Sequence, residues 1–463
     1  MMIKQLLFAP LLFTYVNTFA QSIQATKIDS LLNTLHHKEM FNGNVLVAKG
    51  RKIIYRGSRG IANVATGASL NPETIFELAS VSKAFTAIAV VLLEKRGKLA
   101  YDDLMSKYIP ELSDYGNINI KHLLQHTSGL PDYMDLFIEK WDKSHFVTNE
   151  TIVTEFVKHK PVVHFQPGER FEYSNTGYAL LALIIERIAK ESFGTFLKNN
   201  IFDPLDMSNT SVYRSRYAPR VLKNYAVGYL TDSLDNKVAA DSLGKDHYYY
   251  YLDGVVGDGM VNSTLDDLFK WDRALYTEQL VNSADKALIF QSGVTATGEK
   301  TDYGFGWEIG ESTKYGRLIY HSGGWAGYNT YIGRHIDHDV TIIVLQNNST
   351  FLTYTPKSEI RKIIYDEPLH DPLLKSFKLT DDMLTQYIGN YFEPNIPLNL
   401  NFFKKGDILM LQADGQHALP LDAYEGHTFR YDPANIQLTF NLKAGTINYK
   451  QGKSNFQFMK KKR

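Results

Sequence analysis

Cysteine is absent from this sequence of 463 residues. Its absence excludes disulfide bonds, a cysteine nucleophile, thiolate metal ligands and a lipid-modified N-terminal cysteine. The sequence also lacks an excess of either charge, because 50 Lys and Arg residues balance 50 Asp and Glu residues. We therefore expect neither a nucleic acid nor an anionic membrane surface as a partner.

A Gly-x-Ser-x-Gly motif is also missing, which argues against an α/β-hydrolase. The apolar stretch over residues 6–16 is too short to span a bilayer comfortably. It follows Lys4 and precedes small residues that end at Ala20, which is the layout of a secretory signal peptide. We therefore expect residues 1–20 to be removed after Ala20, leaving a periplasmic or secreted protein with no integral membrane segment.

The residues that are present are typical of a soluble globular protein, with 44% hydrophobic and 22% charged. A chain of this length is expected to form two or three domains. Strands are predicted at residues 44–48, 53–56, 317–320, 328–333 and 340–346, and helices at 27–38, 81–93, 178–190, 356–365 and from Thr264 onward. This order predicts an α+β fold over residues 21–365. One antiparallel sheet, flanked by helices, is assembled from both ends of that range around a helical subdomain.

The end of the chain has a different pattern. Residues 366–378 contain two prolines and little periodicity, which predicts a linker. Residues 379–463 show short alternating runs broken by turn signals, which predict a small antiparallel β-barrel-like domain. No cluster of nucleophile, base or ligand residues stands out in it. We expect this domain to be structural or to cover the cleft.

Ser80 and Lys83 are the first candidates for chemistry. Their i,i+3 spacing at the start of an apolar helix places the two side chains next to each other. The helix N-terminus favours negative charge on the serine, and a half-buried lysine can act as a base. The same spacing recurs at Ser242 and at Ser283, where no apolar helix follows, so the pattern alone is weak.

Two further motifs follow in order. Tyr173 and Asn175 form a Tyr-x-Asn motif directly before a predicted helix, and a predicted strand runs into His321-Ser322-Gly323-Gly324. Together with Ser-x-x-Lys, these resemble the three motifs of the serine β-lactamase and penicillin-binding superfamily. The Tyr-x-Asn motif and residues 123–130 and 257–264 resemble the class C branch and its esterase and D-peptidase relatives. The resemblance covers about residues 25–365.

The resemblance implies a role for each matching residue. Ser80 would be the acylated nucleophile and Lys83 its proton partner. Tyr173 would be a general base or proton shuttle, and which of Lys83 and Tyr173 is the base in acylation stays open. Asn175 would orient Lys83 and bind the acyl side of the substrate. The backbone N–H groups of Ser80 and Gly324 would form the oxyanion hole.

The third motif, which the resemblance implies to be substrate-binding through His321, Ser322 and Gly323, departs from the β-lactamase pattern. Class C β-lactamases have Lys-Thr-Gly at this place. Histidine supplies a less reliable positive charge, since its unperturbed pKa is ~6.5, so recognition of a β-lactam carboxylate should be weaker. The sequence therefore predicts an exported serine hydrolase that acts through an acyl-enzyme on a small ester or a D-amino-acid-type amide or peptide. A class C-type β-lactamase and a β-lactam or peptidoglycan sensor without turnover are the alternatives.

Other residues that resemble functional motifs have simpler interpretations. His122 and His126 have the i,i+4 spacing of a helical metal pair, but we expect neither a metal site nor a cofactor. His335 and His338 are expected to be solvated near a turn. The run of tyrosines at 248–251 is predicted to be a half-buried strand rather than a lining of the cleft. The oligomeric state stays open.

Overall fold

The computed structural model describes residues 23–232, 236–350, 352–369, 379–394, 396–424, 427–431, 434–452 and 454–461. The predicted signal peptide and residues 370–378 of the predicted linker lie outside these ranges. No helix in the described part of the chain combines the length and the hydropathy that crossing a bilayer demands.

Helices and strands are mixed along the described chain. The α-helices are α1 (Ile23–His37), α2 (Lys83–Lys95), α3 (Ile120–Leu124), α4 (Tyr133–Lys140), α5 (Asn149–His159), α6 (Asn175–Ala189), α7 (Phe193–Leu197), α8 (Tyr248–Tyr251), α9 (Leu265–Ala274), α10 (Ser283–Ile289), α11 (Lys357–Ile364) and α12 (Asp381–Thr385). The strands that precede the C-terminal barrel are β1 (Gly43–Lys49), β2 (Lys52–Arg59), β3 (Ile61–Asn63), β4 (Ala68–Ser69), β5 (Phe76–Glu77), β6 (Ser211–Val212), β7 (Tyr229–Thr231), β8 (Lys237–Ala239), β9 (Val261–Ser263), β10 (Glu308–Ser312), β11 (Gly316–Trp325), β12 (Tyr328–His335), β13 (Val340–Gln346) and β14 (Asn348–Ser349). A 3₁₀ turn, η1 (Ala79–Ser82), precedes α2.

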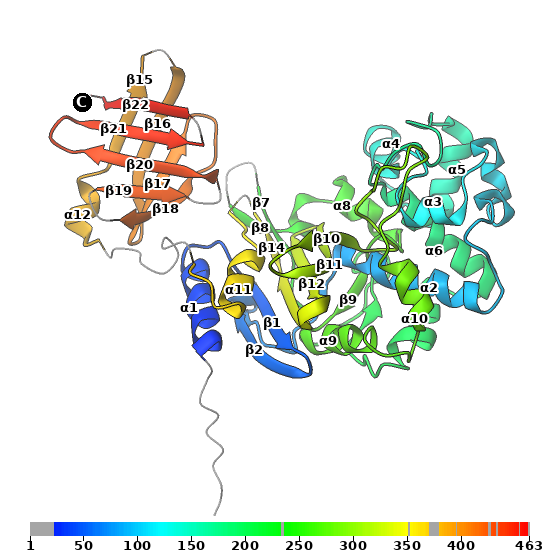
Figure 1. Cartoon of the computed structure of the whole chain (residues 1–463). Helices are drawn as coiled ribbons and strands as arrows, with labels where there is room; N and C mark the ends of the chain where they lie inside the picture. The colour runs from blue at the N-terminus through cyan, green and yellow to red at the C-terminus, as the bar shows by residue number, and fades with distance from the viewer. Residues whose placement is uncertain are drawn as a thin grey trace, which may run out of the picture.

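A six-stranded antiparallel sheet runs through the centre of the described molecule in the order β10-β11-β12-β13-β1-β2. Strand β1 pairs with β13 from Gly43 opposite Gln346 to Lys49 opposite Val340. Segments nearly 300 residues apart in the sequence therefore lie side by side, as the neighbouring blue and yellow strands of Figure 1 show. The predicted sheet built from both ends of the larger domain is confirmed.

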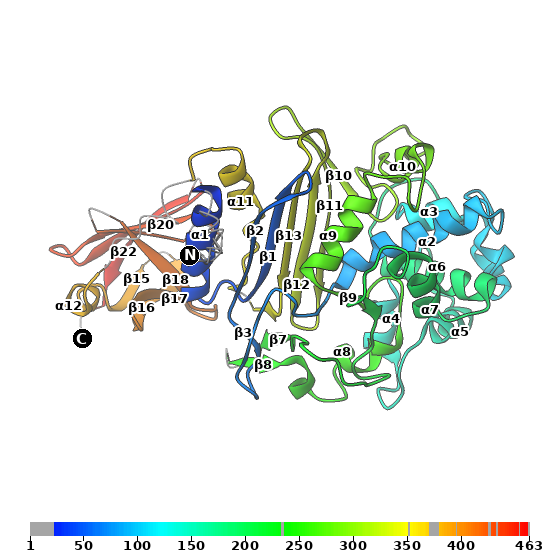
Figure 2. The ribbon, with the colours of Figure 1, turned by 90° about the horizontal axis from the view of Figure 1, so that it is seen from below.

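Alternate side chains of β1 enter two different cores, because successive residues of a strand face opposite sides of the sheet. Val45 and Val47 pack in one core with residues of α1 and α11. Leu46 and Ala48 pack in the other with residues of α2 and α9. Figure 2 shows the sheet between these two layers, with α1 and α11 on one face and α2 and α9 on the other.

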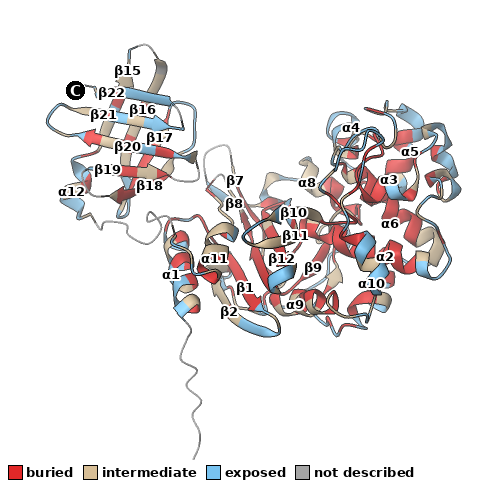
Figure 3. Cartoon of the chain, in the orientation of Figure 1, coloured by how far each residue is buried: buried red, intermediate tan, exposed pale blue. Residues whose placement is uncertain are grey.

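The helical subdomain is organised around α2 and α6. Residues Ala84–Leu93 of α2 and Thr176–Ile185 of α6 are all buried, so both helices are apolar on every side. The shorter helices α3, α4, α5 and α7 surround α6, and Figure 3 shows the buried residues concentrated in α2, α6 and the central strands. This packing fixes the start of α2 and the start of α6 close to each other.

The C-terminal strands close into a barrel. Its strands are β15 (Gly389–Glu393), β16 (Ile396–Lys405), β17 (Ile408–Ala413), β18 (Leu419–Tyr424), β19 (Thr428–Tyr431), β20 (Ile436–Asn441), β21 (Thr446–Gln451) and β22 (Ser454–Lys460). Aromatic side chains such as Tyr391, Phe402 and Phe440 fill its interior and share the core of α1. A buried ion pair between Lys38 and Asp422 joins the barrel to the end of α1. The predicted α+β fold followed by a small barrel is confirmed.

Three local predictions are wrong. Residues 248–251 form helix α8, whose first turn is capped by His247, rather than a strand. His335 is buried on β12 instead of solvated, because β12 extends two residues further than the predicted strand. Helix α3 ends at Leu124, so His122 and His126 do not lie on one helix.

Candidate active site

The candidate nucleophile lies in the turn between β5 and α2. Ala79, the residue before Ser80, has φ = 49°, a left-handed conformation that alanine rarely adopts. Thr330 holds this turn by donating a hydrogen bond of 2.7 Å from its Oγ1 to the Leu78 carbonyl. The turn places Ser80 at the head of the apolar helix.

Strand β11 approaches this turn so closely that only glycine fits at position 323. A Cβ at Gly323 would lie 2.3 Å from the Leu78 carbonyl oxygen and 3.1 Å from the Ser80 nitrogen. The pairing of β10 with β11 ends at Tyr320, so residues 321–325 have no partner strand on that side among the described residues. Ser322 and Gly324 are exposed while His321 and Gly323 are buried, as alternation along β11 requires.

Lys83 is fully buried and has three hydrogen-bond acceptors around its ammonium group. Its Nζ lies 3.0 Å from Ser80 Oγ, 2.8 Å from Asn175 Oδ1 and 2.9 Å from the Asp258 carbonyl oxygen. Three acceptors match the three N–H groups of a protonated lysine. When the lysine loses a proton, the Ser80 hydroxyl becomes the donor of the 3.0 Å hydrogen bond.

Asn175 is oriented by a carboxylate, that of Asp132, which was not predicted from the sequence. Asp132 Oδ2 accepts hydrogen bonds from the Asn175 backbone N–H at 2.8 Å and from its side-chain Nδ2 at 2.9 Å. The Asn175 amide nitrogen is thereby held toward Asp132, which leaves its oxygen facing Lys83. Asp132 also caps α4 by accepting from the Met134 N–H. No helix was predicted at this place, so no pattern in the sequence singled out Asp132.

Tyr173 lies next to the lysine with its ring 39% exposed. Lys83 Nζ is 4.9 Å from the centroid of the Tyr173 ring, and the ring of His126 lies 4.3 Å away, centroid to centroid. His126 Nδ1 accepts from the Ser174 N–H at 3.2 Å, and burial together with the Lys83 charge lowers the pKa of His126 well below its usual value. The uncharged ring of His126 thus packs against the ring of Tyr173.

His321 of the third motif is buried beside Tyr303. Its Nδ1 lies 2.7 Å from the Ser322 carbonyl oxygen and therefore carries the proton, so Nε2 accepts from the Tyr303 hydroxyl at 2.9 Å. Burial and the neighbouring Lys83 charge lower the pKa of His321 to about 3. His321 is therefore uncharged at neutral pH and supplies no cation for a substrate carboxylate.

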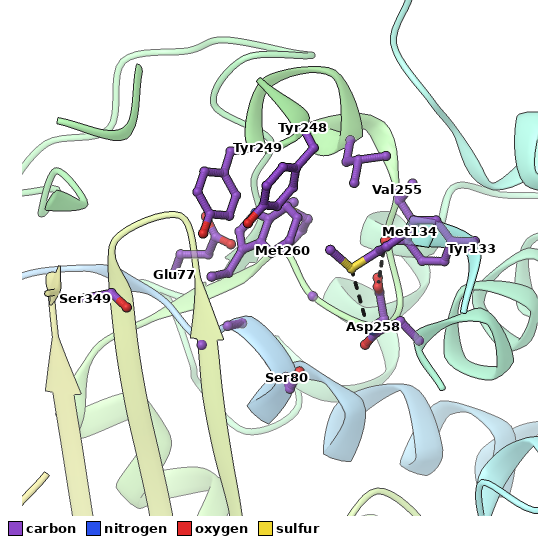
Figure 4. A pocket seen from close by; sticks show the side chains of 16 residues that line it. Glu77, Ser80, Tyr133, Met134, Tyr248, Tyr249, Val255, Asp258, Met260 and Ser349 are labelled. Carbon is purple, nitrogen blue, oxygen red and sulfur yellow. Dashed lines mark hydrogen bonds between the residues drawn. The ribbon is translucent and has the colours of Figure 1, made fainter. Parts of the chain in front are cut away.

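A cavity of about 290 Å³ opens above the serine. Its lining includes Ser80, Asn175 and Gly324 from the predicted site, and Figure 4 shows Ser80 at its floor. The other lining residues are Glu77, Ala79, Tyr133, Met134, Tyr248, Tyr249, Leu252, Val255, Asp258, Gly259, Met260, Trp325 and Ser349. Tyr248 and Tyr249 thus line the cleft, contrary to the sequence-based expectation, because the turn of α8 directs them inward.

Comparison with known proteins identifies the family of this chain. Residues 28–361 match the family described as Beta-lactamase. The chain is 40% identical over 371 residues to Penicillin-binding protein 4* of Bacillus subtilis, covering 79% of this chain and 82% of that protein. The structure of an octameric penicillin-binding protein homologue from Pyrococcus abyssi superposes with a TM-score of 0.66 at 23% identity, covering 94% of this chain and 99% of that one.

A second solved structure also has a fold similar to that of this chain. D-amino acid amidase from Ochrobactrum anthropi has a TM-score of 0.62 at 22% identity, over 74% of this chain and 99% of that one. At this identity the likeness concerns the fold. The family match and the 40% identical relative together decide the assignment: the chain belongs to the Beta-lactamase family of serine hydrolases.

Proposed function

We propose that this protein is an exported serine hydrolase that forms an acyl-enzyme on Ser80 and hydrolyses an ester or a D-amino-acid-type amide or peptide. The observation that carries the proposal is the hydrogen-bonded arrangement of Lys83 with Ser80 and Asn175 at the floor of one cavity. A nucleophile within hydrogen-bond reach of its proton acceptor is the minimum geometry for acyl transfer.

The reaction would proceed in two steps, acylation of Ser80 and hydrolysis of the acyl-enzyme. Ser80 Oγ attacks the substrate carbonyl carbon while its proton passes to Lys83 or Tyr173. The carbonyl oxygen becomes an oxyanion that accepts from the backbone N–H groups of Ser80 and Gly324. The bond to the leaving alcohol or amine breaks, and the leaving group takes that proton. Water then attacks the acyl-serine ester through the same groups, releasing the carboxylic acid and free Ser80.

The charges of the site favour esters and amides over β-lactams. Among the described residues that line the cavity there is no Lys or Arg side chain, and His321 is neutral. A carboxylate on the leaving side of the substrate would therefore be desolvated with no cation in the lining. The alternative of a class C-type β-lactamase or a penicillin-binding sensor draws support from the name of the Bacillus subtilis relative.

A hydrolysis screen tests the proposal and its alternatives together. We expect steady release of p-nitrophenol from p-nitrophenyl butyrate, abolished in Ser80→Ala and retained in Ser242→Ala, a matched serine of the same Ser-x-x-Lys spacing outside the site. Rapid hydrolysis of nitrocefin would favour the β-lactamase. Labelling by a fluorescent penicillin without turnover of any substrate would favour the sensor.

Export is proposed from the sequence of residues 1–20. N-terminal sequencing of the protein recovered from the periplasm or the medium of an expressing bacterium should begin at Gln21. Retention of the full-length chain in the cytoplasm would contradict export.

A further inference from the structure

A buried carboxyl group lines the cavity next to the nucleophile and has no assigned role. Glu77 lies three residues before Ser80, on strand β5, and is 2% exposed. It is one of the cavity-lining residues, and its Oε1 has no hydrogen-bond partner among the described residues. Because an unpaired buried carboxyl group is costly, a complementary ligand group would stabilise it.

No positively charged side chain of the described residues forms an ion pair with Glu77. Arg216 is the nearby positive charge, but it pairs with Asp253 at 3.1 Å and with Asp241. Burial, together with the negative charges of Asp253, Asp258 and Asp241, raises the pKa of Glu77 to about 8, while Arg216 acts in the opposite direction. The free site therefore holds a proton that an arriving cation would displace.

Aromatic rings form the wall above this carboxyl. Tyr248 and Tyr249 lie 4.3 Å apart, centroid to centroid, and Tyr249 meets Trp325 edge-on at 5.0 Å. Figure 4 shows the hydroxyl ends of both tyrosines directed toward Glu77. Aromatic faces and phenol oxygens attract cations, so the wall and the carboxyl group favour the same kind of ligand.

We propose that Glu77, Tyr248 and Tyr249 form a subsite for the ammonium group of the substrate's acyl part. The substrate class would then be amides and esters of amino acids with a free amino group, rather than N-acylated peptides. This inference rests on the proposed function, because it identifies which acyl groups reach Ser80. The described part of the cavity lining contains no Lys or Arg, which agrees with a cationic substrate.

Two anilides that differ only in the amino group test the subsite. We expect kcat/KM for D-phenylalanine p-nitroanilide to exceed that for 3-phenylpropionyl p-nitroanilide about tenfold or more, the usual value of a charge-assisted contact. Glu77→Gln preserves the shape of the side chain but has no proton to release to an arriving cation and cannot become charged, so this ratio should fall toward one. Glu139→Gln, which removes an exposed carboxylate on α4 outside the lining of the cavity, should leave the ratio unchanged.

A second measurement needs no variant. Phenethylammonium should inhibit hydrolysis of p-nitrophenyl butyrate about tenfold more strongly than 3-phenylpropan-1-ol, a neutral molecule of similar size. Equal inhibition by the two, or a ratio of the two anilides that Glu77→Gln leaves unchanged, would overturn the subsite. Absence of p-nitrophenyl butyrate turnover would instead overturn the proposed function, so the two failures are distinguishable.

Discussion

At the scale of single residues, the site depends on side chains whose roles come from tertiary contacts. Ser80, Lys83 and Asn175 could be proposed from the sequence because their spacing and order form motifs. Asp132 and Glu77 could not be proposed, because their roles depend on contacts that only the fold creates. Asp132 contacts Asn175, which lies 43 positions later, and Glu77 lines a cavity formed by segments distant in the sequence.

The first prediction concerns the effect of substituting Asp132 on turnover. Asp132→Asn keeps the size of the side chain, but one amide oxygen must replace a carboxylate that accepts from both N–H groups of Asn175 and from Met134. We expect kcat for p-nitrophenyl butyrate to fall about tenfold, since misplacement of a positioning group by a fraction of an ångström is costly, with KM nearly unchanged.

The control is Asp135→Asn, an exposed residue on the same helix, which should retain wild-type kcat. If Asp132→Asn lowered the melting temperature but left kcat intact, Asp132 would be only a helix cap.

At the scale of elements, the central strands could be predicted and the segments around the site could not. Val45 to Ala48 face two apolar cores in turn, so all four residues are apolar, and such a short continuous run is typical of a strand buried on both faces. Strand β11 continues through Gly323 and Gly324, which carry no side-chain signal, so its predicted end at Tyr320 was too early. Residues 248–251 have strand-forming side chains, but the cap by His247 and the packing of the cavity wall favour a helical turn.

The close approach of β11 to η1 gives a prediction for Gly323→Ala. The added Cβ would lie 2.3 Å from the Leu78 carbonyl oxygen and 2.4 Å from Thr330 Oγ1, so the turn that holds Ser80 must move. We expect kcat to fall about a hundredfold, because a displacement near 1 Å is enough for such a loss.

Gly310→Ala on the neighbouring strand is the matched control, since its Cβ would meet nothing closer than 3.8 Å. Wild-type kcat in Gly323→Ala, with circular dichroism unchanged, would show that β11 does not position the nucleophile.

At the scale of the whole molecule, the sheet separates the chemistry from the barrel. The cavity lies on the side of α2, and its lining comes from residues 77–349, with no described residue of the barrel among them. The barrel shares the core of α1 and α11 on the opposite face. Of the two expectations for the C-terminal domain, this arrangement favours a structural role over covering the cleft.

Ser80 is proposed to carry the acyl group during turnover. The most direct test is acid quenching of the protein during hydrolysis of p-nitrophenyl 3-phenylpropionate, followed by mass spectrometry of its peptides. We predict one phenylpropionyl group on the peptide that contains Ser80, and neither adduct nor hydrolysis in Ser80→Ala. An adduct on another residue, or continued hydrolysis by Ser80→Ala, would contradict it.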